Sequence, residues 1–245
     1  MGLQQYWKKR NFQRTPEPRG KNVPPDGRLR FVIQKHAASR LHYDFRLELN
    51  GTLKSWAVPK GPSLDPAQKR LAVHVEDHPL EYAGFEGVIP EKQYGGGTVL
   101  LWDRGYWEPI GDPGSSYRRG RLTFTLHGEK LHGIWNLVRM GGRKEGGKEN
   151  WLLIKEDDEE AQRGKRGDIT QTLEESVASG KTLEQIAAGE PAVWQPERPS
   201  GKKSRAGSAP RPIKRTPAPG ARKAPLAPWM APQLATLVST SPEGP

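Results

Sequence analysis

The stretch that decides the fold is His36-Ala-Ala-Ser-Arg-Leu-His42-Tyr-Asp44-Phe-Arg46-Leu-Glu-Leu49. From Leu41 onward, apolar and polar residues alternate without a break. Because a β-strand turns successive side chains to opposite faces, this pattern predicts a strand with two different faces. The odd-numbered residues predict a side that packs on a core. The even-numbered residues place an imidazole, a carboxylate and a guanidinium in one row on the other side.

Short β segments separated by Gly- and Pro-rich turns surround this stretch. Asn50-Gly51 is a strong signal for a hairpin turn. Many short strands with few helices predict a mainly β fold, an antiparallel barrel or a sandwich, with one face available for a site. Leu173–Val177 and a capping box at Thr182 predict two short helices near the end of the folded part. The predicted strands are Leu29–Lys35, Leu41–Leu49, Leu53–Val58, Leu71–Val75, Thr98–Trp102, Leu122–Leu126, Gly133–Arg139 and Trp151–Lys155.

Composition narrows the class of protein. The chain has 245 residues, of which 33% are hydrophobic and 51 are Gly or Pro (28 and 23), so it predicts one folded domain with polar, flexible flanks. It has no cysteine, which excludes disulfides and thiolate metal sites. The N-terminus lacks an apolar leader and no apolar run is long enough to span a membrane. We therefore expect a cytoplasmic protein without membrane contact.

The net charge of +11 is unevenly distributed. Residues 196–224 contain nine Lys or Arg and one acidic residue and so carry +8, which leaves +3 for the rest of the chain. A strongly basic protein is often a nucleic-acid-binding protein. Here most of the charge lies in a tail, which fits a solvated linker as well as an arm that contacts DNA.

The polar face of the opening stretch predicts a metal site next to an anion site. If the first two strands pair, His36 can reach His42 and Asp44. Two neutral imidazoles and one carboxylate suit Mn²⁺, Fe²⁺ or Zn²⁺ and leave coordination positions open. Arg46 beside them can hold an anion, so the set points to metal-assisted chemistry on a phosphate. The alternative is an ordinary solvated strand face, but four functional groups in a row are an unusual way to build one.

A second segment, Lys69–Tyr82, adds candidates of the same kind. His74, Glu76 and His78 share one parity, opposite to that of the apolar residues. His78 could orient or protonate a phosphate oxygen, and Arg70 could provide a second contact to the anion.

Four blocks of this sequence resemble the 3′-phosphoesterase module of bacterial DNA ligase D. They cover about residues 6–158 together with the arm Arg10-Asn-Phe-Gln-Arg-Thr-Pro-Glu17-Pro. The blocks are Lys35-His-Ala-Ala-Ser-Arg-Leu-His-Tyr-Asp-Phe-Arg-Leu-Glu48, Ser55-Trp-Ala-Val-Pro-Lys-Gly-Pro62, His78-Pro-Leu-Glu-Tyr82 and Glu91-Lys-Gln-Tyr-Gly-Gly-Gly-Thr98.

The resemblance implies a small antiparallel β-barrel and a Mn²⁺-dependent hydrolase that acts on DNA 3′ ends, with other divalent transition metals as possible substitutes. Members of this family remove a terminal 3′ ribonucleoside and then the remaining 3′-phosphate, which leaves a 3′-OH. On the matching positions, His36, His42 and Asp44 hold the metal. Catalytic contacts to the phosphate come from Arg46, Arg70 and His78, supported by Gln34 and Tyr82.

The N-terminal arm supplies substrate-binding residues by the same resemblance, namely Arg10, Asn11 and Glu17. Asn11 departs from the family pattern, in which an aspartate is expected. An amide keeps the hydrogen-bonding capacity of a carboxylate but loses its charge. The change therefore bears on removal of the ribonucleoside more than on removal of the phosphate.

The resemblance also organises the chain. Residues 1–28 are an arm that contributes to the site, 29–160 the barrel, 161–190 a short helical extension and 191–225 a basic Pro- and Ala-rich linker. Residues 226–245 resemble the start of a ligase module but contain no catalytic lysine motif. The chain is thus expected to be either a fragment of a larger protein or a natural stand-alone form.

The implied role is repair of DNA ends in bacterial non-homologous end joining, in the cytoplasm at the nucleoid. Expected partners are DNA 3′ ends, including primer–templates that end in a ribonucleotide, and a Ku-type protein, a repair polymerase and ligase modules. Two other classes stay open. One is a non-catalytic DNA-tethering module. The other is an iron oxygenase, because His42, Asp44 and His78 imitate a two-histidine, one-carboxylate triad.

Overall fold

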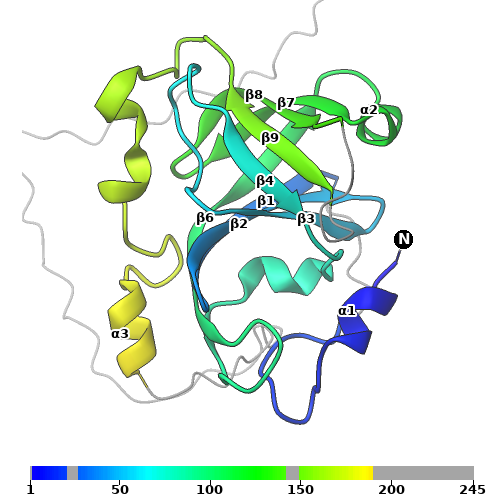
Figure 1. Ribbon diagram of the computed structural model, residues 1–245, viewed down its shortest axis with the longest axis vertical. Coiled ribbons are helices and arrows are strands. Elements are labelled where there is room, and N and C mark those ends of the chain that lie inside the picture. Colours follow the sequence, from blue (N-terminus) through cyan, green and yellow to red (C-terminus); the bar gives the residue numbers. More distant parts are fainter. Residues whose placement is uncertain (1, 21–26, 142–148, 190–245) are drawn as a thin grey trace, which may run out of the picture. The chain divides into compact units, whose positions relative to one another are not determined.

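The computed structural model describes residues 2–20, 27–141 and 149–189. In these residues an antiparallel sheet closes into a barrel (Figure 1). The strand order is β1-β2-β3-β4-β9-β8-β7-β6, and pairing of β1 with β6 closes the ring, while β5 pairs with β6 only. The strands are β1 Leu29–Ala37, β2 Leu41–Leu49, β3 Thr52–Val58, β4 Arg70–His74, β5 Gly87–Ile89, β6 Gly97–Pro109, β7 Arg121–Gly128, β8 His132–Arg139 and β9 Asn150–Lys155. The prediction of a mainly β barrel is confirmed.

The hairpin between β2 and β3 turns at Asn50-Gly51, as predicted. Both residues have positive φ, 54° and 74°. This is the conformation of a two-residue turn whose twist matches that of the flanking strands, and Asn and Gly tolerate it best. The turn sets the register that places Arg46 opposite Ser55.

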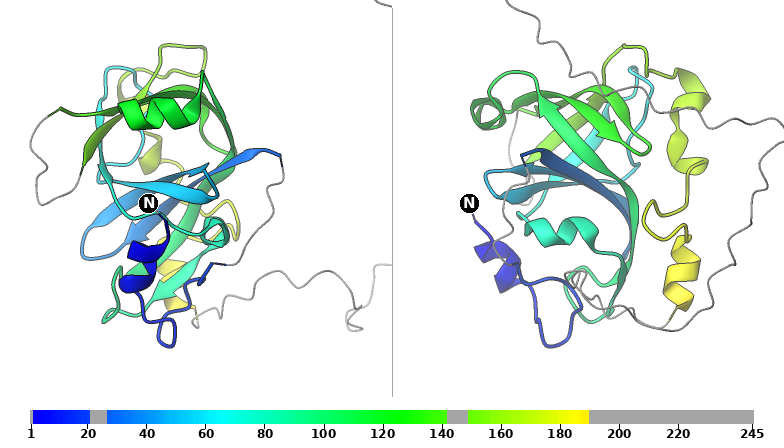
Figure 2. Two further views of the ribbon diagram at one scale, coloured as in Figure 1. Left: turned by 90° about the vertical axis from the view of Figure 1, so that its right-hand side faces the viewer. Right: turned by 180° about the vertical axis from the view of Figure 1, so that it is seen from behind.

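Short helices flank the barrel (Figure 2). The capping box at Thr182 is present: its side chain accepts from the Gln185 backbone and the Gln185 side chain accepts from the Thr182 backbone. The predicted helix at Leu173–Val177 is wrong, because barrel side chains instead hold the Leu173 carbonyl, which accepts from Trp102 and Lys130. The helices are α1 Gln4–Lys8, η1 Leu80–Gly84, α2 Pro113–Arg119, η2 Gly164–Gly167, η3 Ile169–Gln171 and α3 Leu183–Ala188.

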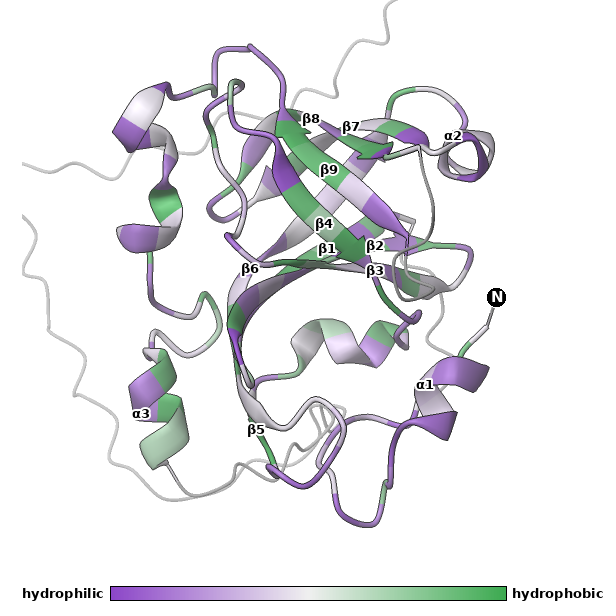
Figure 3. Ribbon diagram, in the orientation of Figure 1, coloured by the Kyte–Doolittle hydropathy of each residue, from purple (hydrophilic) through white to green (hydrophobic). Residues whose placement is uncertain are grey.

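Two apolar layers lie on opposite faces of the β1–β2–β3 part of the sheet. The barrel interior holds the odd-numbered residues of β2, Tyr43, Phe45 and Leu47, with tryptophans from four other strands. Figure 3 shows hydrophobic and hydrophilic residues interspersed along the strands, with clear hydrophobic segments on β4 and β9. The predicted core face is therefore confirmed for β2, except at Leu41, which is 50% exposed.

The second layer lies outside the barrel and was not predicted. There Tyr6 of α1 and Tyr82 of η1 pack with Val32 of β1 and Val99 of β6. Because η1 and the N-terminal arm cover this outer face, the polar residues of β2 that point to it are also buried: Asp44, Arg46 and Glu48 are only 7%, 2% and 5% exposed.

Strand β6 is much longer than the predicted Thr98–Trp102. Asp103 and Gly105, beyond the predicted end, both lie inside the strand. The Asp103 carboxylate accepts from the backbone of Arg104 and of three residues in the turn between β7 and β8. A Cβ on Gly105 would stand 2.0 Å from the His127 carbonyl oxygen, so the strands approach too closely for a side chain there.

Some predictions lie beyond these observations. The linker 191–225 and the ligase-like start at 226–245 fall outside the described residues, and the predicted boundaries of the arm, barrel and extension stay predictions. In the described part of the chain, no helix combines the length and the apolar character needed to cross a membrane.

Candidate active site

Strand register gathers the predicted polar residues on the outer face of β1 and β2. In this pairing Gln34 lies opposite Asp44, and His36 lies opposite His42. All four residues share the parity that faces away from the barrel interior. Arg46, two residues beyond Asp44, continues the same row next to Ser55 of β3. The predicted proximity of His36 to His42 and Asp44 is therefore observed.

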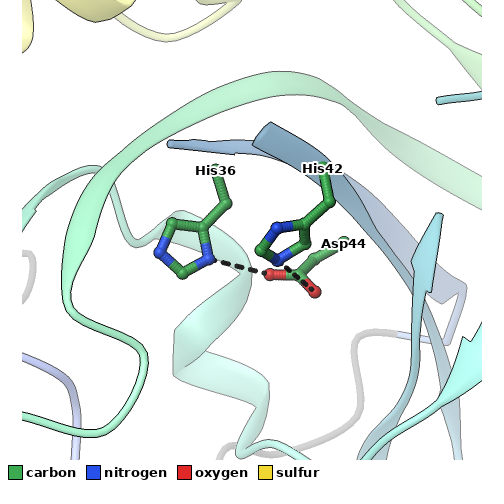
Figure 4. A group of neighbouring side chains, drawn as sticks. All are labelled: His36, His42 and Asp44. Atoms are coloured by element: carbon green, nitrogen blue, oxygen red, sulfur yellow. Dashed lines mark ion pairs between the residues drawn. The ribbon is translucent and has the colours of Figure 1, made fainter. Parts of the chain in front are cut away.

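His36, His42 and Asp44 form a candidate metal centre (Figure 4). One potential ligand atom from each lies within 4.8 Å of the others. The His36 Nδ1 and His42 Nε2 atoms stand 3.6 and 3.7 Å from the two Asp44 carboxylate oxygens. These distances are longer than those of normal hydrogen bonds, and the three side chains converge on one point.

The outer nitrogens of both rings have partners that orient them toward that point. His36 Nε2 donates to the Gly95 carbonyl at 3.0 Å, and His42 Nδ1 donates to the Arg40 carbonyl at 2.9 Å. A backbone acceptor on one ring nitrogen fixes the tautomer that presents the other nitrogen as a lone pair, as histidine ligands of metals require. Two such nitrogens and a carboxylate fit a divalent transition metal.

A neighbouring positive charge keeps the Asp44 carboxyl ionised, as a ligand of a cation must be. Burial alone would raise the pKa of the Asp44 carboxyl, but the Arg46 guanidinium at 3.0 Å outweighs it and holds the pKa far below its usual range. The carboxylate is therefore ionised at any physiological pH. An ionised oxygen ligand is what a divalent metal needs.

Arg46 is held in one orientation by its neighbours. Its Nε donates to Gln34 Oε1 at 2.8 Å, one Nη to Ser55 Oγ at 2.8 Å and the other to Asp44 at 3.0 Å. Gln34 is held in turn, because its amide donates to the carbonyls of Tyr82 and Phe85. The structure thus places Gln34 behind Arg46, as a residue that positions it.

His78 lies between two arginines. Its Nδ1 is 2.9 Å from Arg46 Nη1, and its Nε2 is 3.0 Å from Arg10 Nη2. Burial, followed by these two cations, lowers the pKa of His78 well below its usual value. Arginine only donates, and a neutral imidazole has only one acceptor nitrogen. The Glu76 backbone carbonyl lies 2.9 Å from Nδ1 and accepts its proton, so Nε2 is the acceptor nitrogen and takes the hydrogen bond from Arg10. The Arg46 contact at Nδ1 is therefore not a hydrogen bond, which leaves an N–H of Arg46 available to an anion.

This burial predicts a pH dependence of stability. The unfolded chain takes up a proton on His78 near pH 6.5, whereas the folded protein does not. Folding stability is therefore complete above this pH and falls as the pH decreases. In EDTA, we expect His78→Gln to flatten the slope of the unfolding free energy between pH 6.5 and 5 by about 1.4 kcal/mol per pH unit.

Urea titrations at several pH values measure that slope. His132→Gln, at an exposed position on β8, is the control and should leave it unchanged. Within the cluster, the carboxyls whose pKa values are lowered, Asp44 and Glu76, lose their contribution only at lower pH, outside this window. Equal slopes for wild type and His78→Gln would contradict the assignment of His78 as a buried neutral group.

The N-terminal arm completes this cluster. Arg10 donates from Nε to Glu17 at 2.8 Å and from Nη1 to Glu76 at 3.0 Å. Glu17 is 5% exposed and also accepts from the Tyr82 hydroxyl at 3.1 Å. Burial, followed by the charge of Glu17, raises the pKa of Tyr82 well above its usual value, so Tyr82 stays a donor. The predicted residues Arg10, Glu17 and Tyr82 thus lie together.

Three candidate residues are not brought to the cluster. Asn11 is exposed, and its side chain accepts from the Gln13 backbone within its own turn. Arg70 has the parity of the buried Ala72, which belongs to the barrel interior, whereas the cluster lies on the outer face. The ion partner of Arg70 is Asp168, at 3.8 Å. His74 has the same inward parity and contacts Trp56, so it does not join His78.

Sequence reasoning left several contributors without a role or missed them. Glu76 was a candidate because of its parity with His78, but no role was assigned to it. In the structure it anchors both Arg10 and Lys9. Ser55 contacts Arg46, and only strand register could have paired them. The Gly95 carbonyl that orients His36 comes from a distant loop, which no local pattern reveals.

Fold and site together define the class: a closed β-barrel with a candidate divalent-metal site and a buried arginine beside it on the outer face. Residues 34–139 match the family described as the DNA ligase D 3′-phosphoesterase domain. This segment of the chain, which includes the end of β1 and all of β2 to β8, therefore belongs to that family.

Curated relatives agree with this assignment. The chain is 50% identical, over 244 residues and 99% of its length, to the multifunctional non-homologous end joining protein LigD of Pseudomonas aeruginosa. It is 43% identical over 159 residues to the protein of that name from Mycolicibacterium smegmatis, and 46% identical over 145 residues to the non-homologous end joining DNA repair protein LigD of Mycobacterium tuberculosis. These matches cover 61% and 57% of the chain. The chain spans only 27%, 20% and 18% of these three proteins.

Proposed function

We propose that this domain is a DNA 3′-end-healing phosphoesterase of bacterial non-homologous end joining. It removes a terminal 3′ ribonucleoside and then the remaining 3′-phosphate, and leaves a 3′-OH end that can be extended or sealed. The observation that carries the proposal is the juxtaposition of the His36–His42–Asp44 cluster with Arg46 and His78 in a segment of the 3′-phosphoesterase family.

The metal in this proposal is Mn²⁺, held by His36, His42 and Asp44. The two nitrogen ligands favour Mn²⁺ or another transition metal over Mg²⁺, which prefers oxygen ligands. When bound, the metal would act as a Lewis acid on the phosphate and on water. Both histidines are oriented with a lone pair toward the cluster, and the Asp44 carboxylate is ionised. These two features support the assignment of these residues as metal ligands.

The protein side chains have separate roles in the reaction. Arg46 and Arg10 hold the non-bridging oxygens of the phosphate and stabilise the negative charge that grows there as water attacks phosphorus. Gln34 and Ser55 keep Arg46 in place, and Glu17 does the same for Arg10. Fixed donors need little reorganisation in the transition state, which is the advantage of so buried a network.

His78 supplies the proton for the leaving oxygen. In the free protein it is neutral, because burial and two arginines disfavour its charge. An incoming phosphate brings negative charge next to the ring, and an opposite charge raises the pKa of an imidazole. His78 then gains a proton and donates it as the P–O bond breaks. The leaving group is the 5′-OH of the ribonucleoside in the first step and the 3′-OH of the strand in the second.

The substrate and context come from the family. We propose primer–templates with a terminal ribonucleotide or 3′-phosphate as substrates, in the bacterial cytoplasm at the nucleoid. A Ku-type protein, a repair polymerase and ligase modules are the proposed partners. Asn11 lies outside the cluster, so we expect the chain to retain removal of the ribonucleoside as well as of the phosphate.

The test is a labelled primer–template with one 3′ ribonucleotide, incubated with Mn²⁺, Mg²⁺ or EDTA and followed on a sequencing gel. We expect Mn²⁺-dependent, stepwise shortening to a 3′-phosphate and then to a 3′-OH. If the protein removes a 3′-phosphate but not the terminal ribonucleoside, the proposed first step is contradicted, and Asn11 in the N-terminal arm is the expected cause. No reaction with any metal, together with salt-dependent binding, would replace the proposal by a DNA-tethering module.

A further inference from the structure

The loop between β5 and β6, residues 90–96, forms one side of the candidate metal centre. Its Gly95 carbonyl accepts from His36 Nε2 at 3.0 Å. At the loop end, a Cβ on Gly97 would stand 2.2 Å from the Ala37 carbonyl oxygen, and the residue has a φ of 144°. Only glycine permits this close approach to the end of β1. The loop is therefore pressed against the strand that carries His36.

Tyr94 projects from this loop and remains 45% exposed. Its hydroxyl accepts from Lys9 Nζ at 3.1 Å, and the same ammonium lies 4.7 Å from the ring centroid. The Arg10 guanidinium is 5.6 Å from that centroid. Lys9 is held in turn by Glu76 at 3.0 Å. The tyrosine is thus fixed in orientation although nearly half of its surface is open.

Its position connects the two halves of the site. Through Gly95, the neighbouring residue, it adjoins His36 and the candidate metal centre. Through Arg10 it adjoins His78, at 3.0 Å from that guanidinium. A phosphate held between the arginines and the metal ligands would place the nucleoside attached to it at the rim where Tyr94 stands. Aromatic side chains stack on any base, because every base has a π face.

We propose that Tyr94 is a substrate-binding residue that stacks on the terminal nucleoside of the DNA strand whose 3′-phosphate is removed. The inference rests on the proposed function and deepens it, because it assigns recognition of the last nucleoside to a residue outside the metal and phosphate contacts. Lys9 and Arg10 hold the ring by its hydroxyl and by cation–π contacts, and so leave it ready for stacking.

The test compares two primer–templates that end in a 3′-phosphate, one with a normal terminal base and one with an abasic terminal nucleotide. Binding is measured by fluorescence anisotropy in EDTA, and KM and kcat are measured in Mn²⁺. Tyr94→Ala should weaken binding of the normal end and raise its KM by about tenfold, within the range of one lost base–aromatic stack. For the abasic end, Tyr94→Ala should change neither the binding affinity nor KM by more than about twofold.

Two further variants separate stacking from structure. Tyr94→Phe keeps the ring and loses the hydroxyl contact with Lys9, so it should bind the normal end within about twofold of wild type. Tyr106→Ala is the matched control, because Tyr106 stacks on His127 and lies near Arg28, away from the cluster. It should behave as wild type on both ends.

Each contrary result has a distinct meaning. Equal weakening of both ends by Tyr94→Ala would overturn the inference, since the tyrosine would then only brace the loop and the arm. Unchanged binding of the normal end by Tyr94→Ala would overturn it as well. A wild-type protein that releases no phosphate from the normal end would instead overturn the proposed function.

Discussion

His42→Ala is expected to remove metal-dependent turnover while the fold stays intact. The side chain provides one of three converging ligand atoms, and a metal contributes several kcal/mol to the stabilisation of a phosphate transition state. We therefore expect kcat/KM in Mn²⁺ to fall by roughly a thousandfold or more. The His42 side chain is 22% exposed and makes one hydrogen bond, to the Arg40 carbonyl, so stability should change by about 1 kcal/mol or less.

Two measurements separate the metal from the fold. Electron paramagnetic resonance titration of Mn²⁺ reports the loss of the site directly, and circular dichroism with urea unfolding reports the fold. His132→Ala removes an exposed histidine on β8 and should match wild type in every assay. Near-normal Mn²⁺ binding and turnover by His42→Ala would overturn the metal assignment. Lost binding with normal turnover would make the metal irrelevant to catalysis.

Arg46→Ala is expected to cost both stability and activity. The guanidinium is only 2% exposed and contacts Gln34, Ser55, His78 and Asp44. Removing one partner of a buried ion pair leaves an uncompensated charge, here the Asp44 carboxylate, and such changes cost about 3–5 kcal/mol. Urea unfolding at pH 7.5 in EDTA measures this loss. Turnover of the 3′-phosphate end should fall below detection, because the phosphate loses its fixed donor.

Arg46→Lys tests the geometry rather than the charge. A lysine restores a cation near Asp44 but cannot reach Gln34 and Ser55 with a planar fork. We expect it to recover part of the stability and little of the turnover. Arg104→Ala is the control for a surface pair, because Arg104 and Glu129 are 51% and 48% exposed and such pairs contribute about 1 kcal/mol or less. Full activity of Arg46→Lys would contradict the role of Arg46 as an oriented phosphate contact.

Alternation of side chains along β2 was enough to predict much of the fold and the metal cluster. A strand has a period of two, so Tyr43, Phe45 and Leu47 had to share one face and His42, Asp44 and Arg46 the other. The Asn50-Gly51 turn predicted that the next strand pairs with β2 as a hairpin, because few dipeptides adopt the conformation of this turn. These signals are local, and local signals can be read directly from a sequence.

Other signals failed because tertiary contacts outweighed them. The predicted strand ended at Trp102, but a carboxylate with four backbone donors and a close strand crossing continue β6 through Asp103 and Gly105. Arg70 is typical of an anion contact, but the parity of β4 directs it to the other face of the sheet. The sequence contains no measure of which strand face will be covered.

By itself, the sequence determined the strand that carries the candidate site, the chemical types of its potential metal ligands and the family of the barrel. Only the tertiary structure decided that the polar face would be buried. The N-terminal arm and η1, distant in sequence, close over the outer face of β1 and β2 and bring Arg10 against His78. Burial removes water from these charges, and this desolvation, with the two arginines, keeps His78 neutral and makes the hydrogen-bond network rigid. Such an effect depends on which surfaces meet, and that is a property of the folded chain.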